Sequence, residues 1–216
     1  MKKIITILLV LFLNALNVPV FADHYAYAVS ILDDGKNPAY QKYYTLIRQN
    51  KNAELKRLLT QEGNADTSNA KRASLIHVAS HFGNIHALRL LIQNGANIQA
   101  ATFGGWSALH YAAFAGHAQI ANTLIAMGLD VSNTDAGGET SLFYAIESGN
   151  MNTVKTLVEQ GADIQHNNGK GDTPLSIAQN HGQKSIEEYL RLHIKKTENT
   201  AVAAKQKATD GHNHSH

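Results

Sequence analysis

The chain has 216 residues, of which 44% are hydrophobic and 17% charged, which is enough apolar material for one folded domain. It contains no cysteine, and this excludes disulfides, thiolate metal sites, iron–sulfur clusters, cysteine nucleophiles and a lipoprotein anchor. Lys and Arg number 19 against 17 Asp and Glu, a formal net charge of +2. Without a larger basic surplus, a nucleic-acid ligand is not expected.

The N-terminal segment, 1–22, has the layout of an export signal. Two lysines precede residues 4–13, which are apolar apart from Thr6, and residues 20–22 read Val-Phe-Ala ahead of a cleavage point. A membrane anchor is the alternative, because residues 4–22 could cover most of a bilayer, but two asparagines and a proline disfavour it. We expect cleavage after Ala22, a periplasmic or secreted location, no membrane contact afterwards, and equal numbers of basic and acidic side chains in the mature chain.

Three series of glycines recur at one constant spacing, which is typical of a repeat architecture. The series are Gly83, Gly116, Gly149 and Gly182; Gly95, Gly128 and Gly161; and Gly105, Gly138 and Gly171. Ahead of the first series, residues 74–79, 107–112, 140–145 and 173–178 read Ser-Leu-Ile-His-Val-Ala, Ser-Ala-Leu-His-Tyr-Ala, Thr-Ser-Leu-Phe-Tyr-Ala and Thr-Pro-Leu-Ser-Ile-Ala. The chain therefore consists largely of copies of one short unit.

Each unit predicts two helices and a turn. A Ser or Thr caps the first helix, and Pro174 stands at a first helical position, where its missing N–H costs nothing. In the second helix, apolar residues recur at i, i+3 and i+4, as in Leu88, Leu91 and Ile92, and a glycine follows at the C′ position. This stripe has no partner within its own unit and is buried only when units stack. Protruding turns are expected at residues 98–106, 131–139 and 164–172.

The units resemble the ankyrin repeat, whose signature Thr-Pro-Leu-His-x-Ala is followed by a glycine, a second helix ending in Leu-Leu, and Gly-Ala-Asp. The resemblance implies an all-α fold, a solenoid of stacked helix-turn-helix units with protruding β-turn loops. It covers residues 40–194 in five units, which are 40–70 as the N-terminal cap, 71–103, 104–136, 137–169, and 170–194 as the C-terminal cap. In the N-terminal cap we expect helices at Tyr40–Ile47 and Ala53–Thr60, preceded by an arm or helix at residues 23–39.

His77 and His110 invite a catalytic interpretation, but both occupy the histidine position of the repeat. There, the resemblance implies, the ring hydrogen-bonds the backbone of a turn and ties neighbouring units together. Phe143 replaces this histidine in the third full unit, so that tie is expected to be lost. No acid–base pair, nucleophile elbow or phosphate loop appears at a suitable spacing, and we predict a protein that is not an enzyme and has no cofactor.

Residues 195–216 lack aromatic side chains and a sustained apolar period, so a disordered tail is predicted. The tail ends in His212, His214 and His216, three imidazoles that could hold Zn²⁺, Cu²⁺ or Ni²⁺ weakly. A solvated tail without a ligand is the alternative.

The resemblance places partner binding on the turn tips and on the exposed side of the first helices, which line a concave face. We expect Trp106 to face solvent, because its counterparts Glu139 and Asp172 are charged, and to gather with Phe82, Phe103 and Phe114 at one end of this groove. The alternative is that Phe82 and Phe114 pack under the turns. The complete set of predicted binding residues is His81, Phe82, Phe103, Trp106, Phe114, Glu139, Glu147, Asp172, Asn180 and His181.

Together these features predict an exported, monomeric module that binds a partner protein. Resemblance to exported bacterial ankyrin-repeat proteins implies support of an oxidative-stress enzyme such as catalase. A periplasmic metal-binding protein that uses the histidine tail is a second hypothesis. A secreted effector that binds host proteins is a third.

Overall fold

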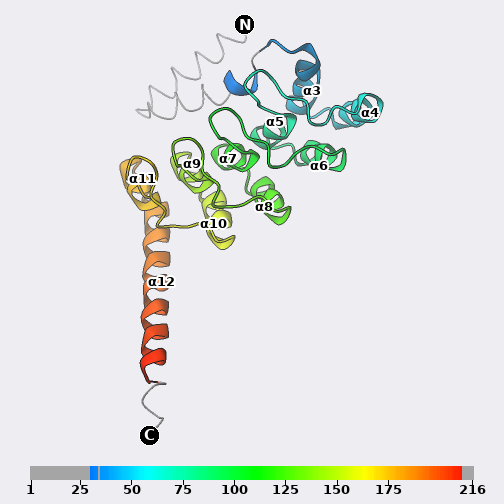
Figure 1. Cartoon of the computed structure of the whole chain (residues 1–216). Coiled ribbons are helices and arrows are strands. Elements are labelled where there is room, and N and C mark those ends of the chain that lie inside the picture. Colours follow the sequence, from blue (N-terminus) through cyan, green and yellow to red (C-terminus); the bar gives the residue numbers. More distant parts are fainter. Residues whose placement is uncertain (1–29, 34, 211–216) are drawn as a thin grey trace.

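A computed structural model describes residues 30–33 and 35–210, and this part of the chain forms five successive helix pairs. The first helices of the pairs lie in one row and the second helices in another, with the turns projecting to one side (Figure 1). The all-α solenoid predicted from the repeat is confirmed. The pairs are α3 (Pro38–Arg48) with α4 (Asn52–Glu62), α5 (Leu75–His81) with α6 (Ile85–Gln93), α7 (Ala108–Phe114) with α8 (Ala118–Ala126), α9 (Ser141–Glu147) with α10 (Met151–Glu159), and α11 (Pro174–Asn180) with α12 (Lys184–Asp210).

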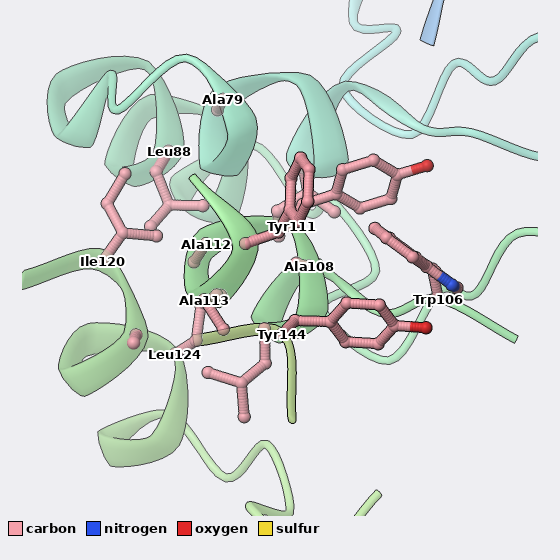
Figure 2. Packing of buried hydrophobic residues seen from close by; sticks show 14 of the residues in the cluster. Ala79, Leu88, Trp106, Ala108, Tyr111, Ala112, Ala113, Ile120, Leu124 and Tyr144 are labelled. Carbon is pink, nitrogen blue, oxygen red and sulfur yellow. The ribbon is translucent and has the colours of Figure 1, made fainter. Parts of the chain in front are cut away.

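The core is a continuous layer between the two rows of helices. Each internal first helix packs between the first helices of its neighbours, so that α7 contacts both α5 and α9. Small side chains on α7 allow this approach, and Figure 2 shows Ala112 and Ala113 close to Leu124 of α8. Two residues of each predicted second-helix stripe are fully buried, as expected: Leu88 and Leu91, Ala121 and Leu124, and Val154 and Leu157.

The first helices of the repeat units begin where the sequence predicted. Ser74 and Ser107 are the N-caps of α5 and α7, while Thr173 caps α11 ahead of Pro174. Antiparallel bridges close the turns at Ser68 with Ser74, Ala101 with Ser107, and Thr134 with Thr140.

Two turn glycines are required by the approach of the next unit as well as by their positive φ. A β-carbon on Gly105 would lie 2.9 Å from the amide nitrogen of Ala136, and one on Gly138 would lie 2.9 Å from that of Gly169. Contacts this short cannot be relieved without moving the backbone of the following turn. The regular recurrence of this glycine therefore reflects the tight spacing of the stack.

The N-terminal cap agrees with its prediction, since α3 and α4 include the two expected helices. Ahead of α3, Ile31 and Leu32 are buried in the core, and the carbonyl of Ile31 accepts a hydrogen bond from Asn69 Nδ2 at 2.6 Å. This part of the predicted arm is therefore attached to the first turn. The predicted signal and its cleavage point lie outside the described residues.

The C-terminal prediction needs a correction, because α12 continues to Asp210 and projects past the stack (Figure 1). The expected disorder is therefore wrong for residues 195–210. The missing apolar period predicts disorder, but this segment has no glycine or proline and is rich in Ala and Lys, which favour helix. Extending an existing helix also avoids the cost of nucleation. Within the described residues, no helix is both long and apolar enough to cross a membrane.

Leu124 provides a test of the buried stripe. Leu124→Ala should lower the free energy of unfolding by roughly 2–5 kcal/mol, because the change removes buried methyl groups and leaves a cavity. Equilibrium urea unfolding measures this loss. The control is Gln119→Ala on the exposed side of the same helix, which should change stability by less than about 0.5 kcal/mol. A loss at Leu124 of under about 1 kcal/mol, well below the usual range, would contradict burial between the units.

Candidate partner-binding surface

Backbone hydrogen bonds join the tips of successive turns into a row. The amide of Phe103 donates to the carbonyl of Lys71 at 3.3 Å, and the same bond recurs one unit later, from Ala136 to Gly104 at 3.0 Å. A third copy joins Gly169 to Gly137 at 3.0 Å. Because only main-chain atoms make these bonds, the side chains at the tips are left available for other contacts.

Phe103 is the predicted binding residue that this row presents most openly, with 70% of its surface exposed. The guanidinium carbon of Arg72, on the preceding turn, lies 5.8 Å from the centre of the Phe103 ring, within the range of a cation–π contact. Met127 and Leu192 are the other large hydrophobic residues exposed in the described part of the chain, and both lie on second helices or their ends.

Trp106 does not face solvent, and the prediction of its exposure is wrong. Only 3% of the residue is exposed, and its ring packs against Tyr144 with centroids 4.3 Å apart. Its Nε1 donates to Asp135 Oδ2 at 3.1 Å, and the same oxygen accepts from the Tyr144 hydroxyl at 2.6 Å. Burial, together with this bond to a carboxylate, raises the pKa of Tyr144. Trp106 therefore joins one turn to the next and belongs to the core.

Glu139 explains why the sequence argument failed. Charge at this position was expected to indicate solvent, yet Glu139 is 6% exposed. Its Oε1 accepts from Asn168 Nδ2 at 3.1 Å and lies 3.6 Å from Lys170 Nζ. One link between turns is thus present in two consecutive units, as Trp106 with Asp135 and as Glu139 with Asn168. The donor and the acceptor exchange places between the two units. In both units the hydrogen-bond partner lies 29 residues further along the chain, and this constant spacing is the sequence signal for the link. The prediction missed both partners, Asp135 and Asn168.

Several predicted residues at the helix ends are also buried, so their expected exposure is not found. His81, Phe114 and Glu147 are buried and Phe82 is half-buried. The rings pack across the units instead of standing apart, and His81 contacts both Phe82 and Tyr111. Of the predicted gathering, Trp106 and Phe114 do meet, with centroids 6.0 Å apart. In the last unit, Asp172 and His181 are half-buried and Asn180 is exposed.

The repeat histidines have the structural role that the resemblance implied. In α5 the amide of Ser74 donates to His77 Nδ1 at 3.0 Å, so the ring proton is on Nε2, which faces the carbonyl of Ala100 at 3.0 Å. His110 repeats this arrangement with Ser107 and the carbonyl of Glu139. Each ring therefore connects the start of a first helix to the turn that follows.

Burial holds these imidazoles neutral. Desolvation lowers the pKa of His77 to about 4 and that of His81 to about 4, and it also lowers the pKa of His110. The hydrogen bond from Nε2 to the carbonyl of Ala100 opposes the shift in the pKa of His77 without overcoming it.

The fold should accordingly lose stability as the pH falls from about 6.5 towards 4. Across this window the unfolded chain binds protons at His77 and His81 while the folded chain does not, so each of these two residues contributes a slope of up to roughly 1.4 kcal/mol per pH unit. Urea unfolding at pH 7, 6 and 5 measures the combined slope. His86→Gln, on the exposed face of α6, should leave it unchanged. A free energy of unfolding that stayed constant from pH 7 to 5 would contradict the prediction, because it would show that the buried rings take up protons as readily in the folded chain as in the unfolded chain.

Trp106 should behave as a core residue under substitution. Trp106→Ala should cost roughly 3–5 kcal/mol of unfolding free energy, as for other buried aromatics. Trp106→Phe keeps much of the ring contact but leaves Asp135 without one donor, so a smaller cost of roughly 1–3 kcal/mol is expected. Urea unfolding of both variants distinguishes packing from hydrogen bonding. Unchanged stability in Trp106→Ala would restore the solvent-facing interpretation.

The described residues contain no group of three or more His, Asp or Glu side chains able to hold a metal ion. His212, His214 and His216 lie outside the described residues, and metal binding there stays a prediction.

Comparison with known families agrees with the geometry. A sequence profile described as ankyrin repeats in three copies matches residues 45–135 and again residues 127–201. These two matches cover most of the chain, from within α3 to within α12. A search of curated proteins finds no significant match.

Proposed function

The chain belongs to the ankyrin-repeat family, and on this basis we propose that it is an exported, non-enzymatic module that binds a partner protein through its turn tips. Ankyrin repeats generally mediate binding to protein partners and are typically not enzymes.

The exposure of Phe103 is the observation that carries this proposal. Burying a large apolar side chain is worth roughly 1.5–3 kcal/mol, and Phe103 forgoes most of that in the free protein. Its backbone is meanwhile fixed to the preceding turn, so little ordering entropy is lost when a partner covers the ring. An aromatic residue held in this way is well suited to be the centre of a protein interface.

The location and partner class rest on other grounds. Export is inferred from the signal-like residues 1–22, and the periplasm is the proposed compartment. The family resemblance makes an oxidative-stress enzyme such as catalase the first partner to test, with host proteins as the alternative for a secreted effector. Metal handling by the tail has no supporting observation among the described residues and is not proposed.

Phe103→Ala should weaken capture of the partner by roughly 30-fold, the equivalent of about 2 kcal/mol for a central aromatic. Residues 23–216 are immobilised, captured proteins are identified by mass spectrometry from a periplasmic extract, and the affinity for each purified candidate, catalase first, is then titrated. Stability should change by less than about 0.5 kcal/mol, because the ring is exposed.

Met127→Ala is the matched control, since it also removes an exposed large apolar side chain but from the end of α8, away from the turn row. Its affinity for the partner should equal that of the unsubstituted chain. If both variants bind equally well, the turn tips are not the binding surface.

A further inference from the structure

We propose that Arg72 and Phe103 form one site for an acidic, extended segment of the partner. In this site a partner carboxylate pairs with the Arg72 guanidinium, and a neighbouring apolar side chain lies on the Phe103 ring. The inference rests on the proposed function and adds the chemistry of the segment that is bound.

Both residues are held in place by the turns and not by their own side chains. Arg72 has a φ of +60°, an unusual conformation for a residue other than glycine. Its amide donates to the carbonyl of Asn69 at 3.0 Å, and Asn69 Oδ1 accepts from the amide of Ala73 at 3.0 Å. The bond from Phe103 to Lys71 then sets the second tip against the first. The site is therefore pre-organised before any ligand arrives.

The charge at this site is available to a ligand. Within residues 30–33 and 35–210, the Arg72 side chain makes no ion pair or hydrogen bond, and its recorded contact is the Phe103 ring. Lys71 beside it donates to the carbonyl of Ser30 at 3.1 Å, which leaves its ammonium group further donors. A guanidinium that already stacks on an aromatic face can still offer its N–H edge to a carboxylate.

The rest of the row suits an extended chain. Ala136 and Gly169 stand at the position of Phe103 in the next two turns, are exposed, and carry little or no side chain. Lys170 follows at the far end, and 71% of its side chain is exposed. Three unit steps of roughly 8–10 Å separate this lysine from Arg72, a span of about eight extended residues. We therefore expect an acidic residue near each end of the bound segment.

Selection from a random dodecapeptide phage library tests the proposal, with the immobilised chain as bait. The unsubstituted chain should enrich peptides that combine Asp or Glu with an apolar residue. Arg72→Glu should instead enrich peptides with Lys or Arg. The matched control is Arg89→Glu, which makes the same charge change on the exposed face of α6 and should select the original acidic peptides.

Titration of one selected acidic peptide gives the magnitude. Arg72→Glu and Phe103→Ala should each weaken its binding by at least tenfold, while Arg89→Glu should leave it within twofold. Three results would overturn the proposal: no enrichment of acidic residues, equal binding by Arg72→Glu, or tenfold tighter binding when phosphoserine replaces the acidic residue, which would indicate a phosphate ligand.

The two proposals can fail separately. If capture of the natural partner depends on Phe103 but is unchanged in Arg72→Glu, the binding function stands and the acidic segment is wrong. If capture does not depend on Phe103 although acidic peptides are selected, the peptide site exists but is not the surface used for the partner.

Discussion

Close contact between neighbouring units is the constraint on which the rest of this molecule depends. A single unit exposes an apolar stripe, and that stripe is buried only when the next helix pair lies against it. The approach is so close that a β-carbon on Gly83 would come within 2.5 Å of the His117 ring, and one on Gly116 within 2.5 Å of the Asn150 side chain. Stability is therefore a property of the interfaces between units, and most side chains near an interface are committed to it.

This commitment explains which predictions the sequence could support. The helix pairs, their caps and their glycines follow from local rules that recur in every unit. A pattern that is ambiguous in one unit can therefore be interpreted from the same positions in the others. The exposure of a single side chain cannot be predicted in this way, because it depends on neighbours that differ from unit to unit. Trp106 was assigned to solvent from the charge of its counterparts, but Glu139 is itself buried with Asn168 as a partner. A charged residue indicates solvent only when no partner can reach it, and here the partner comes from the following turn.

The third full unit shows how the stack tolerates a departure from its own pattern. Phe143 stands where the two preceding units have His77 and His110, which bond to the following turn, so that bond is absent there, as the sequence predicted. His166, on the following turn, instead places Nε2 2.9 Å from the carbonyl of Gly138, and its ring meets Phe143 edge-on at 6.0 Å. The tie between the two turns is thus kept by a different residue. Sequence comparison within the repeat could find the missing histidine but not its replacement, because His166 has no counterpart in the other units.

Some side chains pack between units and others do not, and this difference explains why the turn tips are suited to partner recognition. Trp106 and Phe114 are buried and pack against Tyr144 of the next unit, so any change made there to suit a partner also changes the stability of the stack. Residues 103, 136 and 169 bond to the preceding turn through main-chain atoms, so the side chains at these positions can range from phenylalanine to none without loss of those bonds. Binding specificity can therefore vary at Phe103 while the free energy of folding stays nearly constant. Side chains that the solenoid does not need for folding can therefore determine which partner is bound at little cost in stability.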